Sequence, residues 1–173
     1  MNSRLLNVIL NGVAARWYFM FKNMLTLVFS IYCIKYIIFK LIENHDMGQH
    51  GLDEINLTLE ALGGVLVGLG VLMECRHIIL RSMGKEFTPL QLYLNEISEY
   101  CGVGVLIIGL TIEVLTVVMI VPPEVINTTG LEIYIYSANI LLVVCACIIN
   151  FIFIKECGKT FFRAPPEVRV HHH

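Results

Sequence analysis

Three polar side chains interrupt long apolar runs of the sequence and are the first candidates for chemistry: Lys35, Glu113 and Asn139. Charged groups at membrane depth are costly, so they usually face protein or water and have a partner. A rise of about 1.5 Å per helical residue places all three roughly 3–5 Å to the same side of the centres of their runs. We therefore expect a Lys35–Glu113 ion pair supported by the Asn139 amide. This group could relay protons or ions or coordinate an ion in a pathway, or it could be a structural clasp, with Lys35 alternatively extending its ammonium to the membrane surface.

A second polar cluster follows the apolar part of the second run and consists of Glu74, Cys75, Arg76 and His77. Histidine, cysteine and glutamate are metal-ligand types, and the cluster could also line a vestibule. No HExxH or CxxC spacing accompanies it, so a network of ion pairs is the simpler interpretation. If the protein were an enzyme, which we do not expect, thiol or metal redox chemistry at Cys75, His77 and Cys147 would be its basis.

The segment between the first and second runs holds His45, Asp46 and His50, which are weak candidates for binding a divalent cation. His45 and His50 are five residues apart, a spacing that fits neither face of a regular helix. A solvated acidic loop is the alternative, because Glu43, Asp53 and Glu54 also lie in the segment 43–58.

The composition defines the elements that must position these residues. Hydrophobic residues make up 57% of the 173 residues and charged residues 15%, with a mean hydropathy of +0.74, against roughly 45–50% and 25% in soluble domains. This excludes a soluble globular domain, a disordered chain and a collagen. P-loop, dinucleotide-binding and G-x-S-x-G motifs are absent, and no pair of histidines lies on facing runs where it could ligate haem. We expect no cofactor and no nucleic-acid partner.

Four apolar runs, at 17–42, 59–80, 101–121 and 131–154, are each long enough to cross a bilayer. We therefore expect an all-α integral membrane protein whose single domain, 1–170, is a four-helix transmembrane bundle. Pro122 and Pro123 should end the third span, and Gly130 precedes the fourth. Residues 1–16 show helical apolar spacing typical of an amphipathic interfacial segment, with a cleaved signal as the alternative, and 171–173 resemble a purification tag.

Two features concern helix packing. Gly64 and Gly68 form a GxxxG motif, which lets helices approach closely in lipid. The motif could pack the second span on the third, where Gly102, Gly104 and Gly109 are also small, or it could form a subunit interface. The six cysteines all lie in or beside the spans, which favours packed free thiols over disulfides.

The basic residues predict the orientation. Ten of the twelve lie on the side of both termini and of the connection between the second and third spans, whereas Lys35 and Lys40 lie towards the other side. By the positive-inside rule, both termini are cytoplasmic.

The fourth run contains the stretch LEIYIYSANILLVV, residues 131–144. It resembles the last span of the phosphate-starvation-inducible PsiE family. The resemblance implies a small bacterial inner-membrane protein with four spans and both termini in the cytoplasm. That family has no established reaction or catalytic residues to carry over, and this chain has a longer connection between its second and third spans.

These observations favour a small, homo-oligomeric membrane protein for the permeation or transport of ions, protons or small solutes. The alternative is a non-catalytic assembly or regulatory subunit whose segment 82–100 contacts a partner protein. The lipid bilayer is the expected surrounding in both cases.

Overall fold

The computed structural model describes residues 16–43, 49–82, 89–121, 125–126 and 130–162. These residues form four long helices, α2 (Arg16–Glu43), α3 (Gln49–Glu74), α5 (Pro89–Ile120) and α6 (Glu132–Phe162), and the short α4 (Arg76–Ser82). All four long helices are long and apolar enough to cross a membrane. The described chain is therefore all-helical, as expected, and its spans indicate a multi-pass membrane protein.

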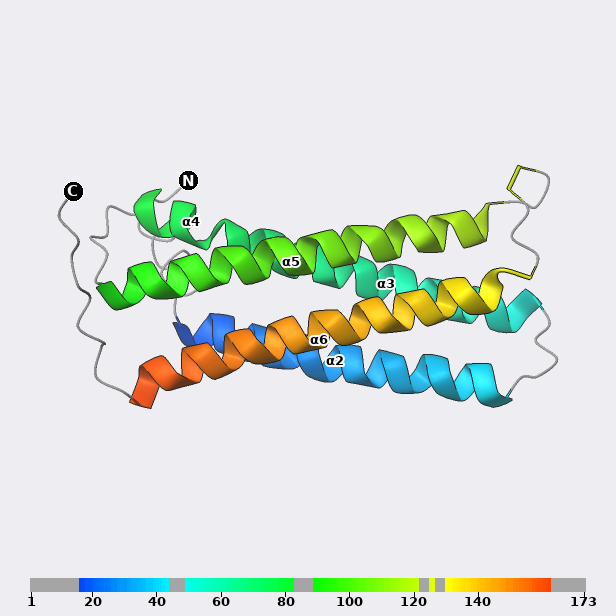
Figure 1. Cartoon of the computed structure of the whole chain (residues 1–173), viewed down its shortest axis with the longest axis horizontal. Helices are drawn as coiled ribbons and strands as arrows, with labels where there is room; N and C mark the ends of the chain where they lie inside the picture. Colours follow the sequence, from blue (N-terminus) through cyan, green and yellow to red (C-terminus); the bar gives the residue numbers. More distant parts are fainter. Residues whose placement is uncertain (1–15, 44–48, 83–88, 122–124, 127–129, 163–173) are drawn as a thin grey trace, which may run out of the picture.

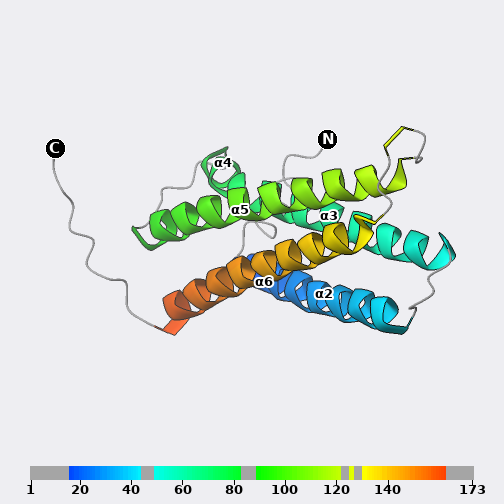
Figure 2. The ribbon, with the colours of Figure 1, turned by 45° about the vertical axis from the view of Figure 1, so that its right-hand side comes forward.

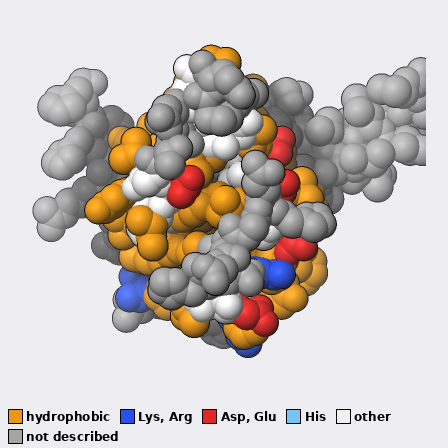
Figure 3. All heavy atoms as spheres, turned by 90° about the vertical axis from the view of Figure 1, so that its right-hand side faces the viewer, with side chains coloured by type: hydrophobic (Ala, Val, Ile, Leu, Met, Phe, Trp, Pro, Cys, Tyr) orange, Lys and Arg blue, Asp and Glu red, His pale blue; other side chains and the backbone are white. Residues whose placement is uncertain are grey.

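The four long helices lie side by side in one elongated bundle (Figures 1 and 2). α2 packs against α3 and α6, and α5 also packs against α3 and α6, so α2 and α5 occupy opposite corners. We call the end where α2 and α5 finish the hairpin end, and the end where they begin the terminal end. Figure 3 looks onto the hairpin end, where acidic side chains lie among hydrophobic ones.

The helices extend beyond the apolar runs that predicted them. α3 begins at Gln49 rather than at 59, α5 at Pro89 rather than at 101, and α6 continues past 154 to Phe162. The 32 residues of α5 span about 48 Å, whereas the hydrocarbon layer is about 30 Å thick. Hydropathy detects only the part of a helix suited to lipid, so these boundaries were wrong at the polar ends.

Helix ends follow local chemistry. Pro89 is the first residue of α5, where its missing N–H breaks no helical hydrogen bond. Gly130 precedes α6 with φ of 84°, a backbone conformation that favours glycine. Within α6, Glu132 lies in the first turn and Lys159 in the last, which suits the helix dipole. α5 ends at Ile120 and α6 starts at Glu132, as the sequence predicted.

Buried residues repeat at alternating spacings of three and four, the pattern of left-handed helix bundles. On α2 the buried positions are Phe19, Asn23, Thr26, Ser30, Cys33 and Ile37. On α6 they are Tyr136, Asn139, Val143, Ala146, Asn150, Phe153 and Cys157. The perimeter of the bundle is instead covered by exposed apolar side chains, as a lipid-facing surface requires.

Candidate functional site

The structure does not bring Lys35, Glu113 and Asn139 together. Lys35 is exposed on the perimeter, Glu113 is half-buried against α3, and only Asn139 is fully buried in the interior. Lys35 and Glu113 come from α2 and α5, which lie at opposite corners, and neither makes an ion pair with any residue that the structure describes. The predicted pair within one chain is therefore wrong. The position of a residue along its helix gives its depth in the membrane, but it does not give the side of the helix on which the residue lies.

The structure instead places a row of uncharged polar side chains in the bundle interior. α2 contributes Asn23, Thr26 and Ser30, and α6 contributes Asn139 and Asn150. All five occupy the alternating three-and-four spacing that points into the bundle. Cys147 of α6 is a neighbour of Ser30. We call these five residues the interior polar row.

Most of the interior polar row lacks hydrogen-bond partners. Both amide atoms of Asn139 and of Asn150 and the side-chain amide oxygen of Asn23 are buried without a bond to any described residue. The Asn23 amide nitrogen donates to the Phe19 carbonyl at 2.8 Å. An unsatisfied buried polar group costs about 1–3 kcal/mol. Polar atoms in this situation are commonly bonded to internal water or to a ligand.

Each end of the bundle contrasts with the row, because a buried polar side chain there is hydrogen-bonded to a side chain of another helix. At the hairpin end the Tyr136 hydroxyl donates to Asn56 Oδ1 at 3.0 Å. At the terminal end Arg76 Nη1 donates to Asn95 Oδ1 at 2.6 Å, and the guanidinium lies 5.3 Å from the centre of the Phe19 ring. The unbonded atoms of the interior polar row thus lie between two hydrogen bonds that each join two helices, one near either end of the bundle.

Only one member of the predicted Glu74–His77 cluster enters the interior. Arg76 is 4% exposed, whereas Glu74, Cys75 and His77 are half-buried. His77 Nδ1 lies 3.2 Å from the backbone carbonyl of Glu74, so this contact orients the ring without forming a metal site. Within the described ranges no group of three metal-ligating side chains occurs.

The weak metal candidates of the first connection are not placed. His45 and Asp46 lie outside the described residues, and His50 is described only as part of the α3 backbone. The cation site there stays a prediction.

Close packing of α3 on α5 uses different glycines from the predicted pair. A Cβ added to Gly70 would lie 2.8 Å from the Gly102 carbonyl oxygen, and one added to Gly109 would lie 3.0 Å from that of Gly63. Gly64 and Gly68 are exposed, and a Cβ on Gly68 would meet nothing within 4 Å. The expected contact between the second and third spans exists, but the GxxxG motif itself faces the perimeter.

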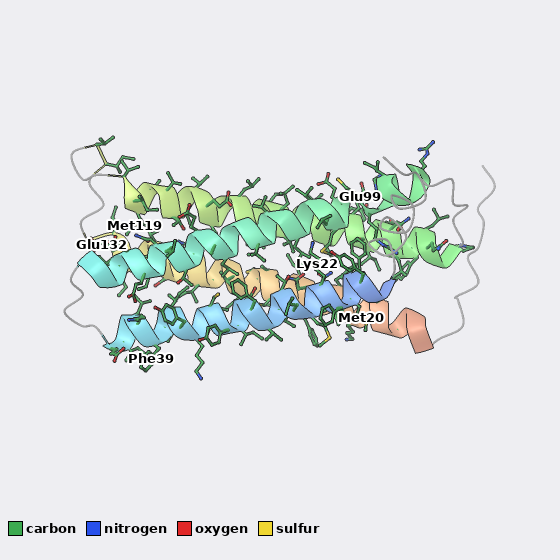
Figure 4. All side chains as sticks on the ribbon, turned by 180° about the vertical axis from the view of Figure 1, so that it is seen from behind. Met20, Lys22, Phe39, Glu99, Met119 and Glu132 are labelled. Atoms are coloured by element: carbon green, nitrogen blue, oxygen red, sulfur yellow. The ribbon has the colours of Figure 1, made fainter. Side chains whose placement is uncertain are left out.

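The perimeter between α2 and α3 is hollowed by a groove of about 330 Å³, lined by Phe29, Tyr32, Cys33, Tyr36, Leu57, Thr58 and Ala61. At its hairpin end the Tyr36 hydroxyl donates to Glu54 Oε2 at 3.0 Å, and Lys40 Nζ lies 2.9 Å from the same oxygen. Lys22, near the start of α2, points toward α3 (Figure 4). The contact between α2 and α3 is therefore less close than the contact between α5 and α3.

Sequence reasoning missed Asn95, Asn56, Asn23 and Ser30 as interior residues. The first two fall on helical turns outside the predicted spans, and the last two are short polar residues that hydropathy averaging hides. Their spacing at three and four residues from buried apolar neighbours was the available signal.

No family model matches this chain, and no curated protein or solved structure is significantly similar to it.

Proposed function

We propose that this protein is a small, homo-oligomeric membrane protein whose bundle interior serves the permeation or transport of protons, ions or small solutes. The interior polar row carries this proposal, because both amide atoms of Asn139 and of Asn150 are buried inside the bundle without a partner among the described residues. Such groups destabilise a bundle unless something binds them. A permeating species that loses its hydration needs replacement hydrogen bonds of this kind.

The chemistry of the row favours certain cargoes. Each asparagine amide can both donate and accept, so Asn139 and Asn150 can bind water or an uncharged solute in either sense. The row contains no carboxylate that would hold a metal cation. Water bound between its members would form a hydrogen-bonded chain suited to protons, with Arg76 at the terminal end opposing bare cations.

Flux measurements on purified protein in proteoliposomes test the proposal. Under a pH gradient or a solute gradient the parent should conduct, and Asn150→Leu or Asn139→Leu should lower the rate by about tenfold or more, because leucine removes the polar lining. Ser137→Ala is the matched control, since Ser137 is exposed on the same helix and donates to its own Ile133 carbonyl. Leucine variants that conduct like the parent would contradict the proposal.

The second candidate is a non-catalytic assembly or regulatory subunit. The first turns of α5 favour it, because Leu92, Tyr93 and Tyr100 are exposed there. In that case the parent would show no flux under any gradient. Alanine substitution of these three residues would then release a partner protein that co-purifies with the parent from its native membrane.

We further propose that the terminal end faces the cytoplasm of a bacterial inner membrane, on the strength of the basic-residue distribution. A cysteine introduced at Gly48 in a cysteine-free variant should react with an impermeant maleimide on intact cells, and one at Gly84 should not. The opposite pattern would reverse the orientation. The resemblance to the PsiE family stays a prediction and adds no function of its own.

A further inference from the structure

Two opposite charges, Lys35 and Glu113, make no ion pair with any described residue and lie seven to eight residues before the ends of α2 and α5. Lys35 is exposed on α2, between the exposed Tyr32 and Ile38. Glu113 of α5 lies along the α3 backbone, with Oε1 3.6 Å from the Cβ position of Gly64, which is itself exposed. Glu60 is exposed on α3 one turn before Gly64 and adds a second negative charge to this face. A charge on a lipid-facing surface is costly unless it has a partner.

The two charges lie at nearly the same depth. The groove between α2 and α3 pairs Cys33 and Tyr36 with the α3 segment 57–61, which places Lys35 at that level. Glu113 packs on Gly63 and Gly64, about one turn or 5.4 Å further along α3. A lysine side chain can bridge that difference. Within one chain it cannot reach, because α2 and α5 are at opposite corners and Lys35 points away from the core.

The surfaces around the two charges differ in side-chain size. On α2 a ridge of exposed side chains repeats at spacings of three and four, and all of them except Lys35 are β-branched. The ridge consists of Val28, Ile31, Lys35, Ile38 and Ile42. On α3 the exposed residues Leu57, Ala61, Gly64, Gly68 and Val71 repeat in the same way. A Cβ added at Gly68 would meet nothing within 4 Å, and one at Gly64 only Glu113 Oε1 at 3.6 Å; we call this bare stretch of α3 the Gly64–Gly68 channel. A second periodic seam on a helix indicates a second packing partner.

We propose that the partner is a second copy of this chain, whose Lys35 ridge docks on the Gly64–Gly68 channel and pairs with Glu113. A rotation about an axis parallel to the helices keeps depth constant, so it brings Lys35 of one copy level with Glu113 of the next. The contact joins two different faces, so it is heterologous and closes a ring by repetition. This inference names the interface of the homo-oligomer in the proposed function and rests on that assembly, but it does not depend on flux.

Charge reversal tests the interface in lipid bilayers, with subunit number measured by single-molecule photobleaching. Lys35→Glu and Glu113→Lys should each raise the concentration needed for assembly by about tenfold or more, because the reversed charge meets a like charge. An equal mixture of the two single variants should form assemblies again, since each contact between the two different variants joins opposite charges. The double variant should also assemble. Glu99→Lys, on the exposed start of α5, is the control and should leave assembly unchanged.

The mixture distinguishes this interface from any contact within one chain, which mixing cannot repair. Gly68→Leu gives a second test, because a Cβ at this exposed position meets nothing within 4 Å in the monomer, and the added side chain would occupy the channel. It should disrupt assembly while helicity and the melting temperature in detergent stay at the parent values. Single variants that assemble like the parent, or a mixture that stays monomeric, would overturn the proposal. Assembly restored without any flux would uphold the interface and contradict only the permeation function.

Discussion

The α3–α5 contact and the α2–α6 half of the interior solve the problem of helix association in opposite ways. Between α3 and α5, glycines bring the backbones so close that an added Cβ on Gly70 would lie 2.6 Å from the Leu106 nitrogen. Between α2 and α6, the interior is lined by Asn23, Ser30, Asn139 and Asn150, most of whose polar atoms lack partners. One contact is dry and tight, and the other is polar and unsatisfied.

The difference separates the part of the bundle that holds the helices together from the part that carries the proposed function. Lipid provides no hydrophobic drive between helices, so packing and hydrogen bonds must hold them together. The glycine contact provides packing, and the Arg76–Asn95 and Tyr136–Asn56 bonds close the two ends. Asn139 and Asn150 make no hydrogen bond to a described residue, which is the reason for proposing that they serve permeation rather than stability.

Gly102→Val should have the largest effect on stability. A Cβ at this position would lie 2.7 Å from the Glu74 nitrogen and 2.9 Å from the Gly70 carbonyl oxygen, and backbone cannot move aside. We expect a loss of about 3 kcal/mol or failure to fold, at the upper end of overpacking costs. Thermal unfolding in detergent measures it. Gly68→Val is the matched control and should behave like the parent; equal losses at both positions would show that the α3–α5 contact is not the scaffold.

Arg76→Met should have the next largest effect. It removes a charged hydrogen bond to Asn95 and the contact with the Phe19 ring, with an expected loss of about 2–3 kcal/mol. Arg76→Lys should restore little, because an ammonium lacks the planar fork of donors. Arg81→Met, at an exposed position on α4, should change stability by less than about 0.5 kcal/mol. A similar loss of stability for Arg81→Met would show that the contacts of Arg76 with Asn95 and Phe19 are not the cause of the effect.

Tyr136→Phe should cost about 1–2 kcal/mol, because it leaves the buried Asn56 oxygen without its donor. Tyr134→Phe is the control on the same helix, since Tyr134 is 70% exposed. Denaturant titration in mixed micelles should separate the two variants. If they proved equally stable, the closure at the hairpin end would be of no energetic importance.

Asn150→Leu should have the smallest effect on stability, because no hydrogen bond to a described residue is lost. We expect a free energy of unfolding within about 1 kcal/mol of the parent, in either direction. Asn95→Leu should cost clearly more, since it removes the acceptor of Arg76. A strong destabilisation by Asn150→Leu would mean that the residue has a structural partner. The interior polar row would then resemble the bonded ends of the bundle.

The sequence predicts the number and class of the helices well, because apolar runs of this length have few alternatives. It predicts α2 almost to its ends, since Arg16 and Glu43 lie directly outside the predicted run 17–42. It misplaces the start of α5 because Leu94, Asn95 and Ser98 face the core from turns that are too polar for a lipid-crossing segment. Hydropathy indicates which part of a helix suits lipid, but it does not indicate where the helix begins and ends.

The site was predicted only in part. Asn139 was expected inside the bundle and is buried there, but Lys35 was given the wrong direction. Cys33 and Ile37, the buried neighbours of Lys35 on either side, share one face of α2, and residue 35 falls opposite them at 3.6 residues per turn. Which faces of two helices meet depends on the packing of the whole bundle, here on the glycines that join α3 to α5. That information is not present in any single helix.

Water contact of the asparagine side chains tests the central claim most directly. Water-edited solid-state NMR on the protein in lipid bilayers can compare the side-chain amides of Asn139 and Asn150 with the backbone amides of Gly70 and Gly102. A hydrated polar row predicts rapid magnetisation transfer from water to both side-chain amides and none to the two glycine amides. Equal exclusion of water from all four groups would contradict the account.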